Sequence, residues 1–199
     1  MPTWDSAEVR RILAGLAAAE PYQPQYQRRQ DGYRLNPPIA PAALDELETR
    51  WGVTLPEPYR SFVLEVGDGG AGPGPCGLFR IDRSDLGRDY DEAELDRAFF
   101  AAPWPHAGPW NDHASVTSQT PDDEEYLDYC SPRWVTGSLN LSHQGCGYMI
   151  RLVVTGDARG QLWEDARCSD GGLLPLSCDF GVWYMTWLAQ TMRSAVPRA

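Results

Sequence analysis

The sequence predicts an α+β protein in which helices come first along the chain and strands follow. Residues 40–74 contain two short amphipathic helices joined at a proline corner. From residue 134 to residue 165, apolar and polar positions alternate or form short apolar runs, as in strands. After Asp179, large apolar side chains again recur at helical spacing, which adds a closing helix. A group of helices followed by a group of strands is typical of the α+β class.

The two central helices share one pattern. Pro41 suits a first helical position, because it lacks the N–H group that would be unpaired there. Gly52 and Gly67 stand where the chain must leave each helix, and Leu55 before Pro56 favours an extended step. The pattern therefore predicts a helix, a tight corner, a second helix and a glycine-rich exit. The apolar positions, three and four residues apart, are Leu44, Leu47 and Trp51 in the first helix and Tyr59, Phe62, Val63 and Val66 in the second.

The segment before these helices divides into a helix and a connector. Asp5 can cap a helix that runs to about Ala19. Residues 21–39 are polar and rich in proline, and we expect an ordered loop because their tyrosines can pack on a surface. We therefore predict an N-terminal helix and connector over residues 1–37, followed by a domain over residues 38–192, with all of them in one globular unit.

Beyond the glycine-rich exit, short strands and two further helices are expected. Residues 101–133 show no clean periodicity, and a long irregular segment in a compact domain is typically either functional or disordered. Its aromatic side chains favour order, because they must bury area somewhere. The predicted strands are residues 76–81, 134–141, 148–155, 161–165 and 171–176, and the predicted helices are residues 91–100 and 179–192.

Composition and charge exclude several classes of function. The 199 residues carry a formal net charge of −11, which argues against binding to nucleic acid or to an anionic membrane. No apolar run approaches the length of a membrane span, and the N-terminus lacks the pattern of a signal peptide. The five cysteines are odd in number and widely spaced, which predicts free thiols in a reducing cytoplasm.

No cofactor or metal motif fits its context. Residues 67–72 match G-x-G-x-x-G, but they follow a helix and run into prolines, whereas a dinucleotide loop precedes a helix. The three histidines share no metal-ligand spacing, and the acidic residues do not follow the calcium-loop pattern. We therefore expect no cofactor and no metal. His143 and Cys146 are close enough in sequence to act as base and nucleophile, although no orienting residue can be identified.

Two stretches of sequence resemble one protein family. The first is Trp51-Gly52, Leu55-Pro56, Tyr59, Phe62 and Gly67-Asp68-Gly69-Gly70; the second is residues 143–148, an apolar strand, residues 160–163 and a Trp/Tyr-rich helix. Together they resemble the SMI1/KNR4 family (SUKH superfamily), in particular its actinobacterial branch, over most of residues 38–190. The resemblance implies a mostly antiparallel sheet with helices packed on one side. It also implies a non-enzymatic protein-binding module.

The resemblance suggests an immunity protein that binds and neutralises a toxin, and the acidic charge suits a basic nuclease as the toxin. Two alternatives remain open: a regulatory scaffold without a toxin, as fungal members suggest, and a hydrolase that uses His143 and Cys146. Aromatic side chains beside carboxylates make good interface anchors, although an insertion packed on its own domain fits the same segment equally well. The predicted partner-binding residues are Asp89, Asp91, Trp104, Trp110, Asp122, Asp123, Glu124 and Glu125.

Overall fold

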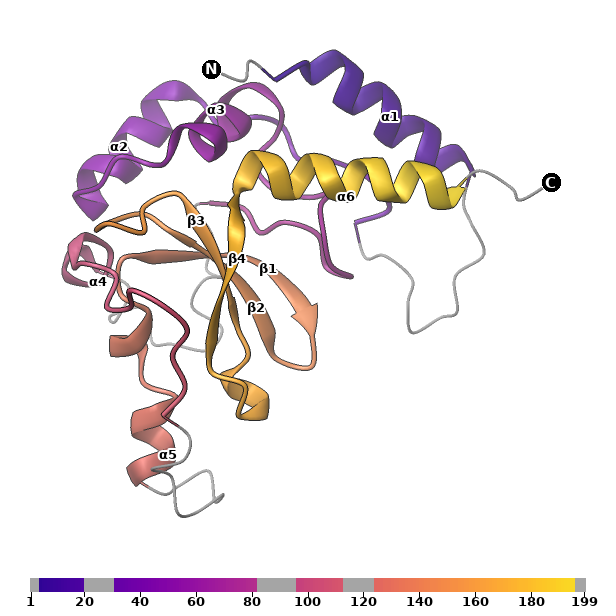
Figure 1. The fold of residues 1–199 in the computed structure, drawn as a ribbon. Helices are drawn as coiled ribbons and strands as arrows, with labels where there is room; N and C mark the ends of the chain where they lie inside the picture. The colour runs from indigo at the N-terminus through magenta and orange to yellow at the C-terminus, as the bar shows by residue number, and fades with distance from the viewer. Residues whose placement is uncertain (1–3, 20–30, 82–95, 113–123, 196–199) are drawn as a thin grey trace.

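The computed structural model describes residues 4–19, 31–81, 96–112 and 124–195 (Figure 1). Within them, four antiparallel strands form one sheet whose spatial order is the order in the sequence. Successive hairpins therefore build the sheet, and the predicted α+β class with a mostly antiparallel sheet is confirmed. The strands are β1 (Ser138–Gly145), β2 (Tyr148–Val153), β3 (Gln161–Asp165) and β4 (Leu173–Asp179).

The helices fall into two groups around this sheet. In Figure 1, α1, α2, α3 and α6 lie above the sheet, whereas α5 extends downward beside the ends of the strands. The predicted caps at both ends of the chain are confirmed, because Asp5 accepts from the backbone N–H of Glu8 and Asp179 from that of Val182. The helices are α1 (Ser6–Ala19), α2 (Pro41–Trp51), α3 (Glu57–Glu65), α4 (Arg97–Ala101), α5 (Glu124–Tyr129) and α6 (Phe180–Ala195), with 3₁₀ turns η5 (Pro132–Val135) and η6 (Arg167–Ser169).

Three predicted elements differ from the structure. The strand expected over residues 76–81 is wrong: Leu78 makes only isolated bridges, because glycine-rich turns bend the chain on its N-terminal side. The strand expected from residue 134 begins at Ser138, since Ser131 caps the η5 turn in front of it. The helix expected over residues 91–100 is described from Arg97, where Asp96 accepts from the N–H of Phe99; residues 91–95 lie outside the described part of the chain.

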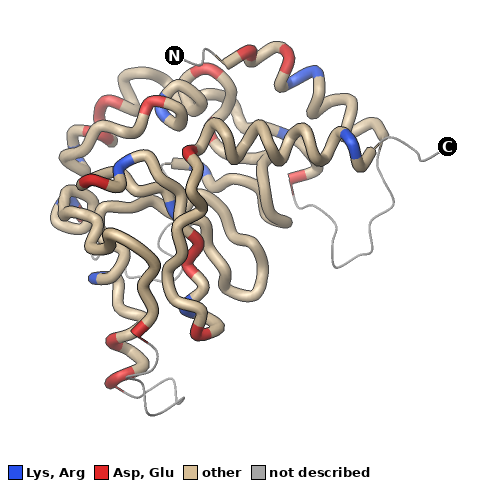
Figure 2. Tube along the Cα trace, in the orientation of Figure 1, with Lys and Arg blue, Asp and Glu red and all other residues tan. Residues whose placement is uncertain are grey.

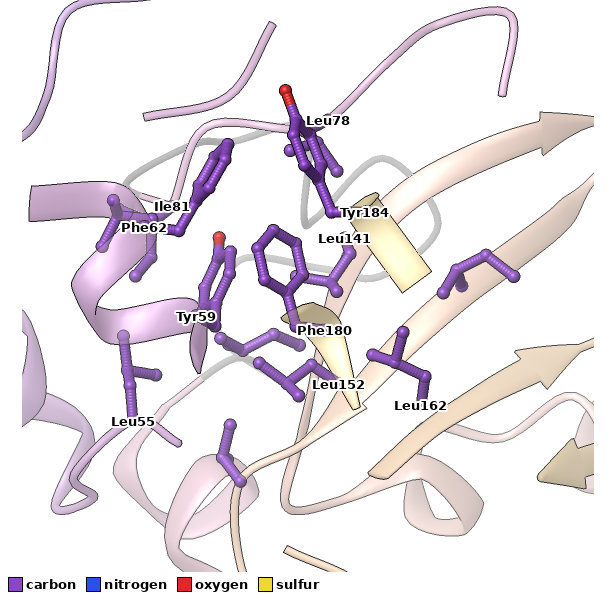
Figure 3. Close-up of a cluster of buried hydrophobic side chains, with 14 of the residues drawn as sticks. Leu55, Tyr59, Phe62, Leu78, Ile81, Leu141, Leu152, Leu162, Phe180 and Tyr184 are labelled. Atoms are coloured by element: carbon purple, nitrogen blue, oxygen red, sulfur yellow. The ribbon is translucent and has the colours of Figure 1, made fainter. Parts of the chain in front are cut away.

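An aromatic cluster joins the N-terminus to the closing helix. The ring of Trp4 lies 5.1 Å from that of Phe62, 6.0 Å from that of Phe180 and 5.9 Å from that of Tyr184. Its indole N–H donates to the carbonyl of Pro58 at 3.1 Å, so the polar atom of the ring is paired as well. Figure 3 shows Phe62, Phe180 and Tyr184 converging between α3, α6 and the sheet. Helix α1 therefore belongs to the same hydrophobic core as the rest of the chain.

At the glycine-rich run after α3, three segments of the chain cross in close contact. The backbone of Gly70 is paired with Leu78 on one side and lies against the chain around Leu35 on the other. Leu78 is bridged in turn to Ser142 of β1, so these segments continue the sheet beyond its first strand. Gly70 has φ 96°, and a Cβ atom there would stand 2.3 Å from the carbonyl oxygen of Arg34. Only glycine fits this crossing without strain.

Alanine substitutions at Gly70 and at Gly15 should have opposite effects on the free energy of unfolding. Gly70→Ala should lower the free energy of unfolding by at least about 1–3 kcal/mol, from the strained backbone alone. Gly15 is an exposed position of helix α1, with no atom within 4 Å of the added Cβ, so Gly15→Ala should raise the free energy of unfolding by about 0.5–1 kcal/mol. Urea unfolding of both variants, followed by tryptophan fluorescence, measures the two effects. Equal stability of the variants would contradict the structural role of Gly70.

Candidate functional site

The structure separates the two tryptophans that the sequence groups together. Trp104 is buried, whereas Trp110 is half-buried and stands near α5. Glu124 and Glu125 are the exposed first residues of α5, and the last residue of that helix, Tyr129, stacks on Trp110. Trp110, Glu124 and Glu125 therefore belong to one region of the molecule. The other predicted acidic residues, Asp89, Asp91, Asp122 and Asp123, lie outside the described residues.

Trp110 is held to the sheet by its backbone. Its N–H donates to the carbonyl of Leu173 at 2.9 Å, and the N–H of Leu173 donates back at 2.7 Å. The pair acts as one bridge on the outer edge of β4. The next residue, Asn111, donates from its side chain to the carbonyl of Asp170 at 2.8 Å and accepts from the hydroxyl of Tyr129 at 3.0 Å. These bonds hold the backbone that carries the Trp110 ring.

Tyr129, Trp110 and Trp134 form a continuous aromatic stack. The Trp110 ring lies 5.5 Å from Tyr129 and 4.7 Å from Trp134, with interplanar angles of 21° and 30°. The guanidinium of Arg133 lies 4.5 Å from the centroid of the Trp134 ring, which adds a cation–π contact. The indole N–H of Trp134 donates to the carbonyl of Asp128 at 2.9 Å. Both indoles are half-buried, so each shows part of its surface to solvent.

Helix α5, whose last residue belongs to this stack, carries acidic and apolar side chains. Glu124, Glu125 and Asp128 are exposed, and Figure 2 shows acidic positions along this helix. Asp128 forms an ion pair with Arg133 at 2.5 Å, which ties the helix to the turn that carries Trp134. Leu127 is 55% exposed and adds apolar area to this helix. We call the surface formed by the aromatic stack, Glu124, Glu125, Leu127 and Asp128 the α5 surface.

Trp104 supports this region from within the core. Its ring lies 5.1 Å from Trp163 of β3 and 5.1 Å from His106, whose ring in turn lies 5.1 Å from Trp110. The segment is fastened nearby, because the hydroxyl of Thr155 donates to the carbonyl of Ala102 at 2.6 Å. Trp104 therefore packs on its own domain, as the alternative interpretation of the segment expects, and a partner cannot reach its ring without displacing the core.

A buried ion triad fixes the same segment to the sheet. Asp165 at the end of β3 receives hydrogen bonds of 2.8 Å from Arg151 of β2 and of 2.8 and 2.9 Å from Arg167 of η6. Arg167 also donates to the carbonyls of Tyr129 and Ser131, at 3.2 and 3.0 Å. Burial alone would raise the pKa of the Asp165 carboxyl, but the two guanidinium groups outweigh it and hold that pKa far below its usual range.

Two titratable groups in this region have shifted pKa values. Burial raises the pKa of the Tyr129 hydroxyl to about 12, so it stays protonated at neutral pH and can donate to Asn111. His106 has a lowered pKa because it is buried, and its Nε2 lies 2.7 Å from the carbonyl of Trp134. In the described part of the chain, no group of three or more His, Cys, Asp or Glu side chains could hold a metal ion. None of the described helices has both the length and the apolar character needed to cross a bilayer.

The His143–Cys146 pair lies elsewhere, at the turn between β1 and β2. Cys146 is exposed, and the ring of His143 is folded over its own turn. The N–H of Gly145 lies 3.1 Å from His143 Nδ1, and the N–H of Gly147 lies 3.3 Å from Nε2. Both ring nitrogens therefore face backbone donors of the turn, which leaves the imidazole poorly placed to take a proton from the Cys146 thiol.

Several residues of the site were not identified from sequence. Trp134 falls in a predicted strand, and Tyr129 lies in the segment without periodicity. A signal for the triad was present, because Arg151 interrupts an apolar strand and a charge at such a position needs a buried partner. Its partner Asp165 and the bridging Arg167 are found only through the pairing of β2 with β3.

The triad predicts a specific pH dependence. Because the pKa of Asp165 is lower in the folded chain than in the unfolded chain, its contribution to stability is complete at neutral pH. It declines as the pH falls below about 4, the usual aspartate pKa, towards the lowered folded-state pKa. Asp165→Asn should lower the free energy of unfolding at neutral pH by about 3–5 kcal/mol, since two guanidinium groups lose their counter-charge.

Urea unfolding between neutral and acidic pH measures this effect. Asp157→Asn, at an exposed position in the turn between β2 and β3, is the matched control and should behave like the parent chain. If the stability gap between Asp165→Asn and the parent were the same in acid as at neutral pH, the ion triad would not be the source of the dependence.

Comparison with known proteins assigns the chain to a family. The model of the SMI1 / KNR4 family (SUKH-1) matches residues 38–164, which is more than half of the chain. No curated protein and no solved structure gives a significant match. The matched residues run from the segment before α2 to β3 and include both α5 and the aromatic stack. The chain therefore belongs to the SMI1 / KNR4 family (SUKH-1), whose domains are generally non-enzymatic, protein-binding modules of the immunity type.

Proposed function

We propose that this chain is an immunity-type protein that binds and neutralises a protein toxin through the α5 surface. One observation carries the proposal: half-buried Trp110 and Trp134 form a stack with Tyr129, the last residue of the helix α5 that begins with exposed Glu124 and Glu125. Family membership supports the general role of protein binding. The choice of surface rests on the geometry of these residues.

The aromatic stack is suited to anchor a partner. Tryptophan and tyrosine are enriched among the residues that dominate binding energy, because each buries a large area on a rigid ring. Here the rings are already fixed by stacking and by the backbone bridge between Trp110 and Leu173. A partner would therefore immobilise little additional side-chain freedom on binding. Leu127 adds exposed apolar area on α5 itself.

The charge selects the kind of partner. The chain has a net charge of −11, and α5 begins with Glu124 and Glu125. Carboxylates around an apolar centre steer a basic protein toward the surface and fix its orientation. A nuclease that binds nucleic acid carries such a basic surface, and the carboxylates would take the place of phosphates. We propose that Asp89, Asp91, Asp122 and Asp123 strengthen the same field, and that Trp104 acts only as a buried support.

Affinity capture with the purified chain tests the proposal. The bait is the full chain, the source is a lysate of the organism that encodes it, and elution uses a rising salt gradient. We expect a basic protein that is released by salt, inhibits growth when expressed alone and loses that effect when the chain is co-expressed. A partner whose expression is harmless would instead support the regulatory-scaffold alternative and contradict the toxin proposal.

The two glutamates of α5 should control the rate of association. Glu124→Gln/Glu125→Gln should slow association several-fold at low salt and weaken its salt dependence, because rim charges act mainly on the encounter. Glu46→Gln/Glu65→Gln changes the net charge equally but on exposed positions of α2 and α3, away from α5 in Figure 1. Surface plasmon resonance at several salt concentrations compares the two variants. Identical kinetics would remove α5 from the interface.

Trp110 should control the lifetime of the complex. Trp110→Ala should weaken binding by about 30-fold or more, mainly through faster dissociation, as expected of a central aromatic anchor. Trp183→Ala, which removes a half-buried tryptophan from α6, is the matched control. Thermal unfolding of both variants separates lost binding from lost folding. Unchanged affinity in a folded Trp110→Ala variant would show that the partner binds a different surface.

A further inference from the structure

Two cysteines that are distant in sequence meet at the end of the sheet. Cys146 lies in the turn between β1 and β2, and Cys168 lies in η6, after β3. Both are exposed and free, whereas the other three cysteines are half-buried. Neither of the two belongs to the α5 surface.

Their proximity follows from the contact between Gly147 and Cys168. A Cβ atom placed on Gly147 would stand 2.7 Å from Cys168 Cβ and 3.0 Å from its Sγ. The Cys168 thiol therefore rests on the residue directly after Cys146. The two thiols also influence each other electrostatically: burial chiefly, then Asp165, and also Cys146 raise the pKa of the Cys168 thiol.

The turn holds Cys146 in an unusual backbone conformation. Cys146 has φ 51° and Gly147 has φ 85°, as the two central residues of a type I′ hairpin turn require. Asn, Asp or Gly ordinarily occupies the first of these positions, because other residues are strained there. Gly145, with φ 100°, flanks the other side, so Cys146 stands between two glycines that add no side chain around its thiol. Cys168, in contrast, follows Arg167, which the ion triad holds in place.

We propose that Cys146 and Cys168 form a reversible disulfide when the protein meets a peroxide. In the first step, the Cys146 thiolate attacks one oxygen of hydrogen peroxide; the O–O bond breaks, water leaves after protonation, and Cys146 becomes a sulfenic acid. In the second step, the Cys168 thiolate attacks the sulfenic sulfur, the S–O bond breaks and a second water leaves. Two thiols are oxidised to one disulfide, and one peroxide is reduced to two waters.

The environments of the two thiols set this order. Cys146 is exposed at the tip of the turn, where an oxidant reaches it first. Cys168 packs against Gly147, and its raised pKa keeps more of it protonated, so Cys168 reacts with the peroxide more slowly than Cys146. A small dithiol would reduce the disulfide by thiol–disulfide exchange and return both cysteines to free thiols. The inference is independent of the toxin-binding proposal, since it requires no partner.

Peroxide treatment of the purified full chain tests the inference. We expect the chain to lose two of its five free thiols, counted after denaturation, and dithiothreitol to restore both. Peptide mapping by mass spectrometry without reduction should find one cross-link, between Cys146 and Cys168. The melting temperature of the oxidised chain should rise, because the cross-link restricts the unfolded state.

Serine variants make the assignment specific. Cys146→Ser and Cys168→Ser should each abolish the intramolecular cross-link, whereas the matched control Cys178→Ser, in β4, should retain it. Cys130 is the competing candidate, because Tyr126 interacts with both Cys130 and Cys168. A cross-link between Cys130 and Cys168, or oxidation of Cys146 to the sulfinic acid with no cross-link, would overturn the proposal.

Discussion

The ion triad of Asp165, Arg151 and Arg167 is the interaction on which the α5 end of the molecule depends. Asp165 is only 6% exposed, and its two cationic partners are buried with it. Such a group is stable only when its charges and hydrogen bonds are matched. Arg167 meets this need with bonds to the carbonyls of Tyr129 and Ser131, which belong to a segment that is otherwise irregular. The triad therefore joins the hairpins of the sheet to the turn that carries the aromatic stack.

Aromatic residues serve two separate purposes in this chain. Trp4, Phe62, Phe180 and Tyr184 close the core between the helices and the sheet, where their contacts stabilise the fold. Trp110 and Trp134 gather at the ends of the strands and remain partly exposed. The division follows from backbone position, because the Trp110 bridge lies on the outer edge of β4 whereas the first cluster is enclosed by α1, α3 and α6.

Periodic parts of the chain were predictable from sequence, and the candidate site was predictable only in part. Apolar spacing correctly indicated α2, α3, α6 and the hairpin of β2 and β3, since neighbours in sequence determine these elements. The apolar residues around Leu78 predict a strand, but Leu78 makes only isolated bridges. Its partners, Gly70 and Ser142, come from two separate parts of the chain, which local sequence does not reveal. Trp110 and Trp104 carry the same local signal, yet contacts with Leu173 and Trp163, about sixty residues further along, place one at the surface and the other in the core.

The residue at which the family match ends divides the α5 surface from the groups that support it. The matched residues, 38–164, contain Trp110, α5 and Trp134, but Asp165, Arg167 and Leu173, which fix their positions, follow the match. The side chains that would face a partner are thus supplied by one part of the chain, and the groups that orient them are supplied by the next. Because recognition depends on the spacing of preformed anchors, changes in either part can alter which partner fits. In the proposed mode of binding, a buried arginine behind the surface therefore matters for specificity as much as a half-buried tryptophan on it.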